Sequence, residues 1–148
     1  MDSGNDRVFP ARLAALSDIV TFVQRFCEAN AIGRSPALRL RLVLEELFTN
    51  TVRHGHRGDC DASVRIALAV LEGYVTVEYE DSAPGYDPLS RMTTLASDEV
   101  TSLEGPPAEG LGSYLVGKSL YGARYAYEDG HNRLWLALPG SNAGTPAG

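Results

Sequence analysis

Apolar positions recur every three to four residues in two stretches near the N-terminus, which predicts two helices. The first helix would begin after Ser17 as N-cap and stop at Gly33. The second would have Ser35 as N-cap, Pro36 at its first position and Gly55 as its C-terminal stop. The apolar face of the first consists of Ile19, Phe22, Val23, Phe26 and Cys27. That of the second consists of Leu40, Val43, Leu44 and Leu47.

Elsewhere the apolar residues alternate with polar ones, which is the period of a strand. Pairs of such runs are separated by Glu72-Gly73 and by Asp129-Gly130, and this predicts two antiparallel hairpins. The strands of these hairpins would cover residues 64–70, 75–79, 123–127 and 133–138. A short strand within 8–13 would precede the first helix, and its proline places it at a sheet edge.

The strands come in adjacent pairs and do not alternate strictly with helices. This order predicts an α+β fold, a two-layer sandwich with a mostly antiparallel sheet and helices on one face. Residues 88–109 show weak periodicity, and a further helix is expected over 111–121. We expect residues 1–148 to form a single domain, with a core of about 7–139 and a tail at 140–148 outside it.

The 148 residues suit one domain with one core, and 44% hydrophobic with 22% charged residues is ordinary for a globular protein. The net charge of −6 argues against a protein that binds nucleic acid through its phosphates. No secretory signal and no apolar run long enough to span a membrane is visible. Cys27 and Cys60 have no metal-site or disulfide spacing, so we expect a cytoplasmic protein.

The first candidate site lies on the second helix, where Glu46, Asn50 and His54 follow one another at i, i+4 spacing along one face. An asparagine oxygen suits Mg²⁺, which also binds phosphates, and a glutamate one turn away suits a general base. The alternative is an ordinary solvated helix edge, on which Glu46 pairs with Arg53 or Arg57 or faces solvent.

The second candidate is Asp81 with Gly85, directly after a predicted strand. A carboxylate there can accept a hydrogen bond from the exocyclic amine of adenine, and a glycine lets the backbone approach a flat base. The alternative is an Asx turn that ends the strand.

The third candidate is Gly110-Leu111-Gly112 at the start of a predicted helix. Backbone N–H groups at such a start favour a polyphosphate. A tight packing turn is the alternative, because this is neither a Walker A pattern nor a dinucleotide-binding pattern.

Together these segments resemble the GHKL ATPase superfamily, and most closely its small serine/threonine kinases of the anti-sigma-factor type. The resemblance extends from about Val8 to Leu138 and rests on four segments in order. These are EELFTNTVRHG, DSAPGYDP, EGLGSYLVGKSL and DGHNRLWLAL.

The resemblance implies a Bergerat-type ATP-binding fold in which Glu46 is the general base and Asn50 the Mg²⁺ ligand. His54 would lie near the phosphates, Asp81 would bind the adenine amine, and Gly85 would pack beside the base. Residues 88–109 would be the ATP lid, and the segment Gly110, Leu111 and Gly112 would support the phosphates.

The resemblance also implies a partner and an assembly. The substrate would be a serine or threonine on a STAS-domain anti-sigma antagonist, the second partner a sigma factor, and the assembly a homodimer. One alternative is a regulatory module with a weakened ATP site that only sequesters its partner, because Ala83 and Glu109 replace residues that are commonly glycine. A module that transfers phosphate to histidine ranks lower, since no helix with an acceptor histidine is visible.

Overall fold

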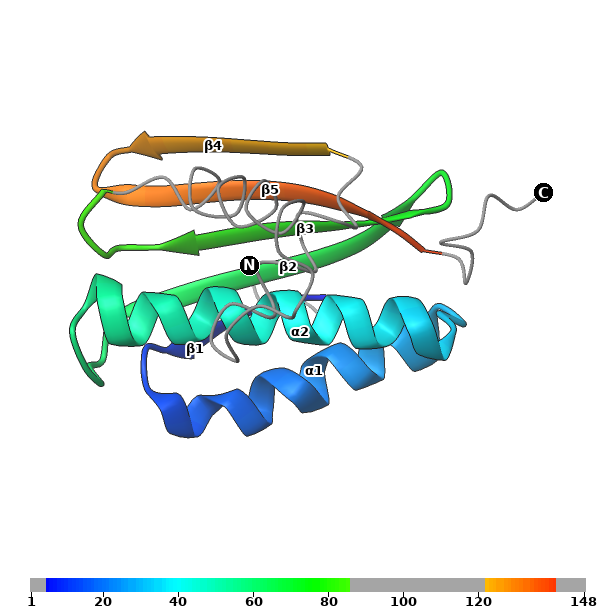
Figure 1. Cartoon of the computed structure of the whole chain (residues 1–148), viewed down its shortest axis with the longest axis horizontal. Helices are drawn as coiled ribbons and strands as arrows, with labels where there is room; N and C mark the ends of the chain where they lie inside the picture. The colour runs from blue at the N-terminus through cyan, green and yellow to red at the C-terminus, as the bar shows by residue number, and fades with distance from the viewer. Residues whose placement is uncertain (1–4, 86–121, 141–148) are drawn as a thin grey trace, which may run out of the picture.

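The computed structural model describes residues 5–85 and 122–140, in which a five-stranded sheet carries two helices on one face (Figure 1). The helices are α1 (Leu16–Ala29) and α2 (Arg34–Asn50), and α2 continues into a π-helical turn at Thr51–Gly55. The strands are β1 (Asp6–Pro10), β2 (Ser63–Leu71), β3 (Tyr74–Asp81), β4 (Gly122–Glu128) and β5 (His131–Pro139). The predicted α+β sandwich is confirmed.

The strand order is β1-β2-β3-β5-β4, and each pair of neighbours in the described ranges is antiparallel. Both predicted hairpin turns are confirmed: Glu72 and Gly73 have φ of 52° and 87°, and Asp129 and Gly130 have 55° and 78°. Two successive positive φ angles give the type I′ turn that matches the twist of the flanking strands. Between β3 and β5, which neither hairpin turn connects, the register places Asp81 opposite Asn132.

The core lies between the helices and the inner face of the sheet. The apolar faces predicted for α1 and α2 are buried there, as are alternate residues of β2, β3 and β5. At the edge strand β1, Phe9 packs edge-to-face against Phe22 of α1 with ring centroids 5.7 Å apart. Burial of these alternating positions fixes the register, because a one-residue slip would turn every apolar side chain outward.

The predicted beginning of α1 was wrong. A 3₁₀ turn at Leu13–Ala15 leads directly into the helix, so the N-cap is Ala15 and Ser17 lies within the first turn. The Ser17 hydroxyl donates back to the Ala14 carbonyl at 3.4 Å. The strand before it is also displaced, to 6–10 from the predicted 8–13.

The connection between the helices was also assigned wrongly. Ala31, with φ of 54°, makes the left-handed turn after α1, and Ile32 N–H donates to the Cys27 carbonyl at 2.9 Å. Gly33 is therefore the N-cap of α2, and its carbonyl accepts the Ala37 N–H at 3.0 Å. Ser35 and Pro36 consequently lie inside the first turn of α2 and not at its boundary.

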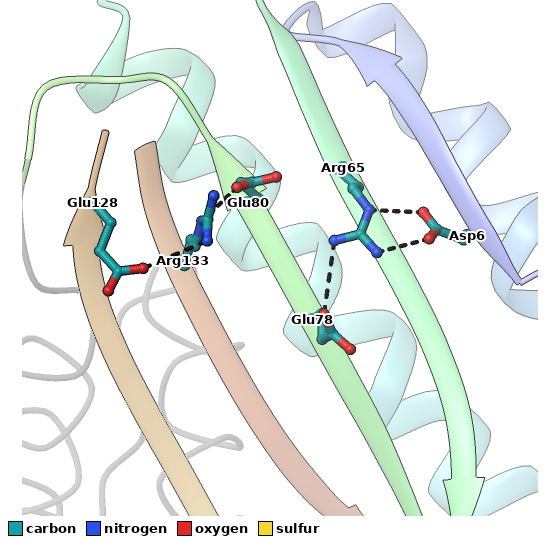
Figure 2. A network of polar contacts seen from close by, with 6 residues as sticks. All are labelled: Asp6, Arg65, Glu78, Glu80, Glu128 and Arg133. Carbon is teal, nitrogen blue, oxygen red and sulfur yellow. Dashed lines mark hydrogen bonds and ion pairs between the residues drawn. The ribbon is translucent and has the colours of Figure 1, made fainter. Parts of the chain in front are cut away.

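The outer face of the sheet, away from the helices, is polar. Two acid–arginine–acid bridges cross it from strand to strand, Asp6–Arg65–Glu78 and Glu80–Arg133–Glu128 (Figure 2). None of the helices in the described part of the chain is long and apolar enough to cross a membrane. The predicted lid at 88–109, the helix at 111–121 and the tail from 141 lie outside the described residues.

Candidate functional site

The Glu46 and Asn50 side chains lie next to each other at the end of α2, as the i, i+4 spacing predicts. Asn50 Nδ2 donates to Glu46 Oε2 at 3.1 Å, and both residues are half-buried. Because the amide nitrogen is turned toward the carboxylate, the carboxamide presents its oxygen on the other side. An oriented neutral oxygen is what a hydrated Mg²⁺ accepts as a ligand, so the pair fits the predicted role.

The helix changes its geometry directly after Asn50. Thr51–Gly55 form a π turn, which the His56 N–H closes by donating to the Thr51 carbonyl, five residues earlier instead of four, at 2.9 Å. The predicted i, i+4 row therefore holds from Glu46 to Asn50 but does not continue regularly to His54, which is exposed. The helical segment still ends at Gly55, as predicted, and the placement of His54 near phosphates stays a prediction.

Asp81 ends β3 on the inner face of the sheet with 2% of its surface exposed. Its Oδ1 accepts the Ala83 N–H at 3.0 Å and Asn132 Nδ2 at 2.8 Å, and its Oδ2 accepts the Thr51 hydroxyl at 2.8 Å. The bond to Ala83 is the Asx turn that the sequence left as an alternative. A carboxylate has about four acceptor positions, so one on Oδ2 remains for an exocyclic amine.

Thr51 connects the π turn to this carboxylate. Its Oγ1 lies 2.7 Å from the Tyr79 hydroxyl, 2.8 Å from Asp81 Oδ2 and 3.0 Å from the Leu47 carbonyl. A hydroxyl has one hydrogen to donate. If Thr51 donates it to Asp81, then Tyr79 donates to Thr51, and the two hydroxyls form a directed chain that ends on the carboxylate.

Asn132 on β5 is the site residue that the sequence analysis missed. It is 4% exposed, and its Nδ2 contacts Asp81 Oδ1, the Ala83 carbonyl at 3.0 Å and the Pro84 carbonyl at 3.3 Å. Its Oδ1 accepts the Tyr125 hydroxyl of β4. One carboxamide therefore holds the Asp81 carboxylate and the turn after β3 together.

Two glycines allow close packing around this turn. A Cβ at Gly55 would lie 2.7 Å from the Cβ of Ala83, which is itself fully buried. The methyl of Ala83 thus fits because Gly55 has no side chain. A Cβ at Gly85 would lie 3.0–3.2 Å from three ring atoms of Tyr127, so the Gly85 backbone lies against an aromatic ring. That Gly85 also packs beside a base stays a prediction.

Comparison with known proteins decides the family. The model of the histidine kinase-like ATPase domain matches residues 9–138 of this chain. The chain belongs to this family. The predicted membership of the GHKL superfamily is therefore confirmed, and ATP is the ligand that the family implies. The described residues suited to ATP and Mg²⁺ are Glu46, Asn50 and Asp81, while the segment Gly110 to Gly112 lies outside the described residues.

Several solved structures are similar to this chain at low sequence identity. A chain of the SiaB–SiaC complex from Pseudomonas aeruginosa superimposes with a TM-score of 0.58 at 18% identity, covering 90% of this chain and 88% of that one. The blue-light activated histidine kinase of Erythrobacter litoralis gives a TM-score of 0.46 at 18% identity, covering 95% and 65%. The histidine kinase AdeS of Acinetobacter baumannii gives 0.45 at 17%, covering 93% and 68%. The search of the curated proteins found no match.

Proposed function

We propose that this chain is an ATP-dependent serine/threonine protein kinase of the anti-sigma-factor type. The observation that carries the proposal is the oriented Glu46–Asn50 pair, in a chain whose family is that of the histidine kinase-like ATPase domain. The Glu46 carboxylate would remove the proton from a hydroxyl as it attacks the γ-phosphate. Mg²⁺, held through the oxygen of Asn50, would neutralise charge on the phosphates.

Asp81 supports the choice of adenine. Its carboxylate accepts hydrogen bonds from Ala83, Asn132 and Thr51, and so it is held in place as an acceptor. The adenine amine at C6 is a donor and fits such a group, whereas guanine has a carbonyl oxygen at that position. Preorganisation of the acceptor lowers the cost of binding, since no side chain has to be ordered when the base arrives.

The proposed phospho-acceptor is a serine or threonine on a small STAS-domain anti-sigma antagonist in the cytoplasm. A neighbour in fold was solved as a two-protein complex, SiaB–SiaC, and this supports a protein partner for the present chain. A phosphate adds about −1.5 to −2 charges and would separate kinase and antagonist. A sigma factor as the second partner and a homodimer as the assembly complete the proposal.

The test begins with thermal unfolding in the presence of Mg-ATP. Binding at a hundred times the Kd would stabilise the folded state by about 2.7 kcal/mol. Asp81→Asn should lose most of this stabilisation, because the substituted amide turns a donor toward the adenine amine or toward Thr51. Unchanged affinity in that variant would disprove the adenine assignment.

The catalytic role is tested by Glu46→Gln, which should bind ATP but fail to phosphorylate a STAS-domain partner. The matched control is Glu45→Gln, one residue along the same helix, whose carboxylate pairs with Arg41 at 2.7 Å. Full kinase activity in Glu46→Gln, or equal losses of activity in both variants, would show that Glu46 is not the general base.

A regulatory module that binds its partner without phosphotransfer is the second candidate. Ala83 favours it, because its buried methyl stands where the family commonly has a glycine, and three of the about four acceptor positions of Asp81 are already used. A protein of this kind would bind the antagonist equally well with and without Mg-ATP. The thermal measurement separates the two candidates, since only the kinase requires stabilisation by Mg-ATP.

A further inference from the structure

A groove runs over the helical layer between α1 and the N-terminal half of α2, with a volume of about 870 Å³. Six of its lining residues are apolar: Val20, Val23, Cys27, Ile32, Ala37 and Leu38. Val23 and Cys27 are buried at its base, whereas Leu38 has 54% of its surface exposed. A leucine this exposed beside an apolar groove leaves a strip of apolar surface in contact with water.

The groove and the proposed ATP site involve different halves of α2. The groove is lined by α2 residues from Arg34 to Arg41, and the site pair begins at Glu46, about 7.5 Å further along the helix axis. The charges along the groove are also different from those of the chain as a whole. The chain carries −6. The groove, in contrast, is lined by two arginines, Arg34 and Arg41, and by one acidic residue, Glu28.

The beginning of α2 adds to this positive character. Its N-cap Gly33 makes no side-chain cap hydrogen bond, and its first turn has no acidic residue, so the first N–H groups have no carboxylate beside them. Arg34 and Arg41 both line the groove, and Arg41 is paired with Glu45. Glu28 lines it from α1, where Gln24 donates to it at 3.4 Å.

We propose that this groove binds an amphipathic helix of a partner protein that carries carboxylates beside its apolar stripe. The apolar stripe would cover Leu38 and the base of the groove, as when a third helix packs on a helical hairpin. A carboxylate of the partner would lie at Arg34 and the uncapped start of α2. Arg41 is paired with Glu45, and Glu28 lines the α1 side of the groove. The preference for an acidic helix over a basic one therefore rests on Arg34 and the start of α2.

The test uses two synthetic helices of about five turns with leucine at i, i+3, i+4 and i+7. One carries glutamate beside the stripe, and the other carries lysine at the same positions. Fluorescence anisotropy with the whole chain should show the glutamate helix binding at least about tenfold more tightly, a difference of about 1.4 kcal/mol. Equal binding of the two helices, or binding of neither, would overturn the proposal.

Two pairs of variants locate the binding. Leu38→Asp should weaken binding of the glutamate helix at least roughly tenfold, as expected for the loss of a central apolar contact. Its control is Leu71→Asp at the end of β2, because Leu71 is 57% exposed and lies outside the groove. Arg34→Glu should reverse the preference between the two helices, while Arg25→Glu on the exposed side of α1 should not.

The oligomeric state of the variants decides between a partner and a second copy of this chain. Light scattering of the wild type and of Leu38→Asp should give the same mass. A lower mass in Leu38→Asp alone would show that another copy fills the groove and would overturn the assignment to a partner. Retained Mg-ATP stabilisation in Leu38→Asp would show that any loss of helix binding is not due to loss of the folded domain.

Discussion

Glu80 and Asp81 are neighbours on β3, yet their carboxylates face opposite sides of the sheet and are held differently. Glu80 points to the outer face and accepts Arg133 Nε at 2.7 Å, in the bridge that continues to Glu128 (Figure 2). Asp81 points inward, is 2% exposed and is held by neutral donors from three other positions. The outer carboxylate has a full counter-charge, and the inner one has only hydrogen bonds.

Burial, and not the presence of an opposite charge, decides which of these arrangements matters more for stability. When an exposed ion pair forms, each charge gains its partner but loses contacts with water. Such a pair therefore contributes only about 0–1 kcal/mol to the free energy of unfolding. A buried acceptor that loses its donor has no water to replace it, which costs about 1–3 kcal/mol and more for a charged group. Changes around Asp81 should therefore be far more damaging than changes in the bridges.

The largest effect is expected from Asn132→Ala. This change removes the donor to Asp81 Oδ1 and to the carbonyls of Ala83 and Pro84. The free energy of unfolding, measured with denaturant, should fall by about 3 kcal/mol. The control is Arg133→Ala, the next residue on β5 but on the outer face, for which we expect less than about 1 kcal/mol. Similar losses in the two variants would contradict the comparison.

The second effect is steric. Gly55→Ala would bring a methyl to 2.7 Å from the Cβ of Ala83, and such overpacking should cost about 2 kcal/mol. Ala83→Gly removes the opposing methyl and should restore most of the loss in the double variant. A double-mutant cycle measures this coupling. If the two changes in the free energy of unfolding simply add, the methyl groups at positions 55 and 83 do not clash.

The third effect isolates one hydroxyl. Thr51→Val preserves the shape of the side chain but removes the donor to Asp81 and the contact with Tyr79, at a cost of about 1.5 kcal/mol. Thr76→Val is the control, because its hydroxyl makes a 3.4 Å contact with the Ala69 carbonyl at an exposed position. Thermal unfolding should show a clear decrease in Tm for Thr51→Val and none for Thr76→Val.

The smallest effect is expected at Asp6 and depends on pH. Its bidentate hydrogen bond with Arg65, at 2.9 and 2.7 Å, lowers the pKa of the Asp6 carboxyl below its ordinary value. A carboxyl whose pKa is lowered by folding stabilises the folded state at pH values above its pKa in the unfolded chain, about 3.9. This contribution is lost as the pH falls through the lowered pKa of the folded state.

Asp6→Asn should therefore be less stable than the wild type by under about 1 kcal/mol at neutral pH. The difference should shrink as the pH falls through the lowered pKa of Asp6, and it should be smaller in molar salt. Urea unfolding of both proteins at a series of pH values measures it. A difference that persists at acid pH would show that Asp6 acts through packing and not through its charge.

The sequence predicted those features that depend on local spacing. The hairpins follow from strand alternation and the turn residues Asp129-Gly130, and the contact between Glu46 and Asn50 follows from helical geometry. It did not reveal Asn132, because the partner of Asn132, Asp81, lies 51 residues earlier and only the strand register brings them together. The start of α1 was missed because a 3₁₀ turn before a helix leaves no distinct composition.

The π turn at Thr51–Gly55 places a constraint on chain length as well as on residue identity. A π turn accommodates about one residue more than an α turn over the same rise. Deleting any one residue between 51 and 55 would let α2 continue as a regular helix and would rotate the segment before the 56–62 loop. Alignments and redesigns of this chain should therefore allow neither a gap nor an insertion in those five positions.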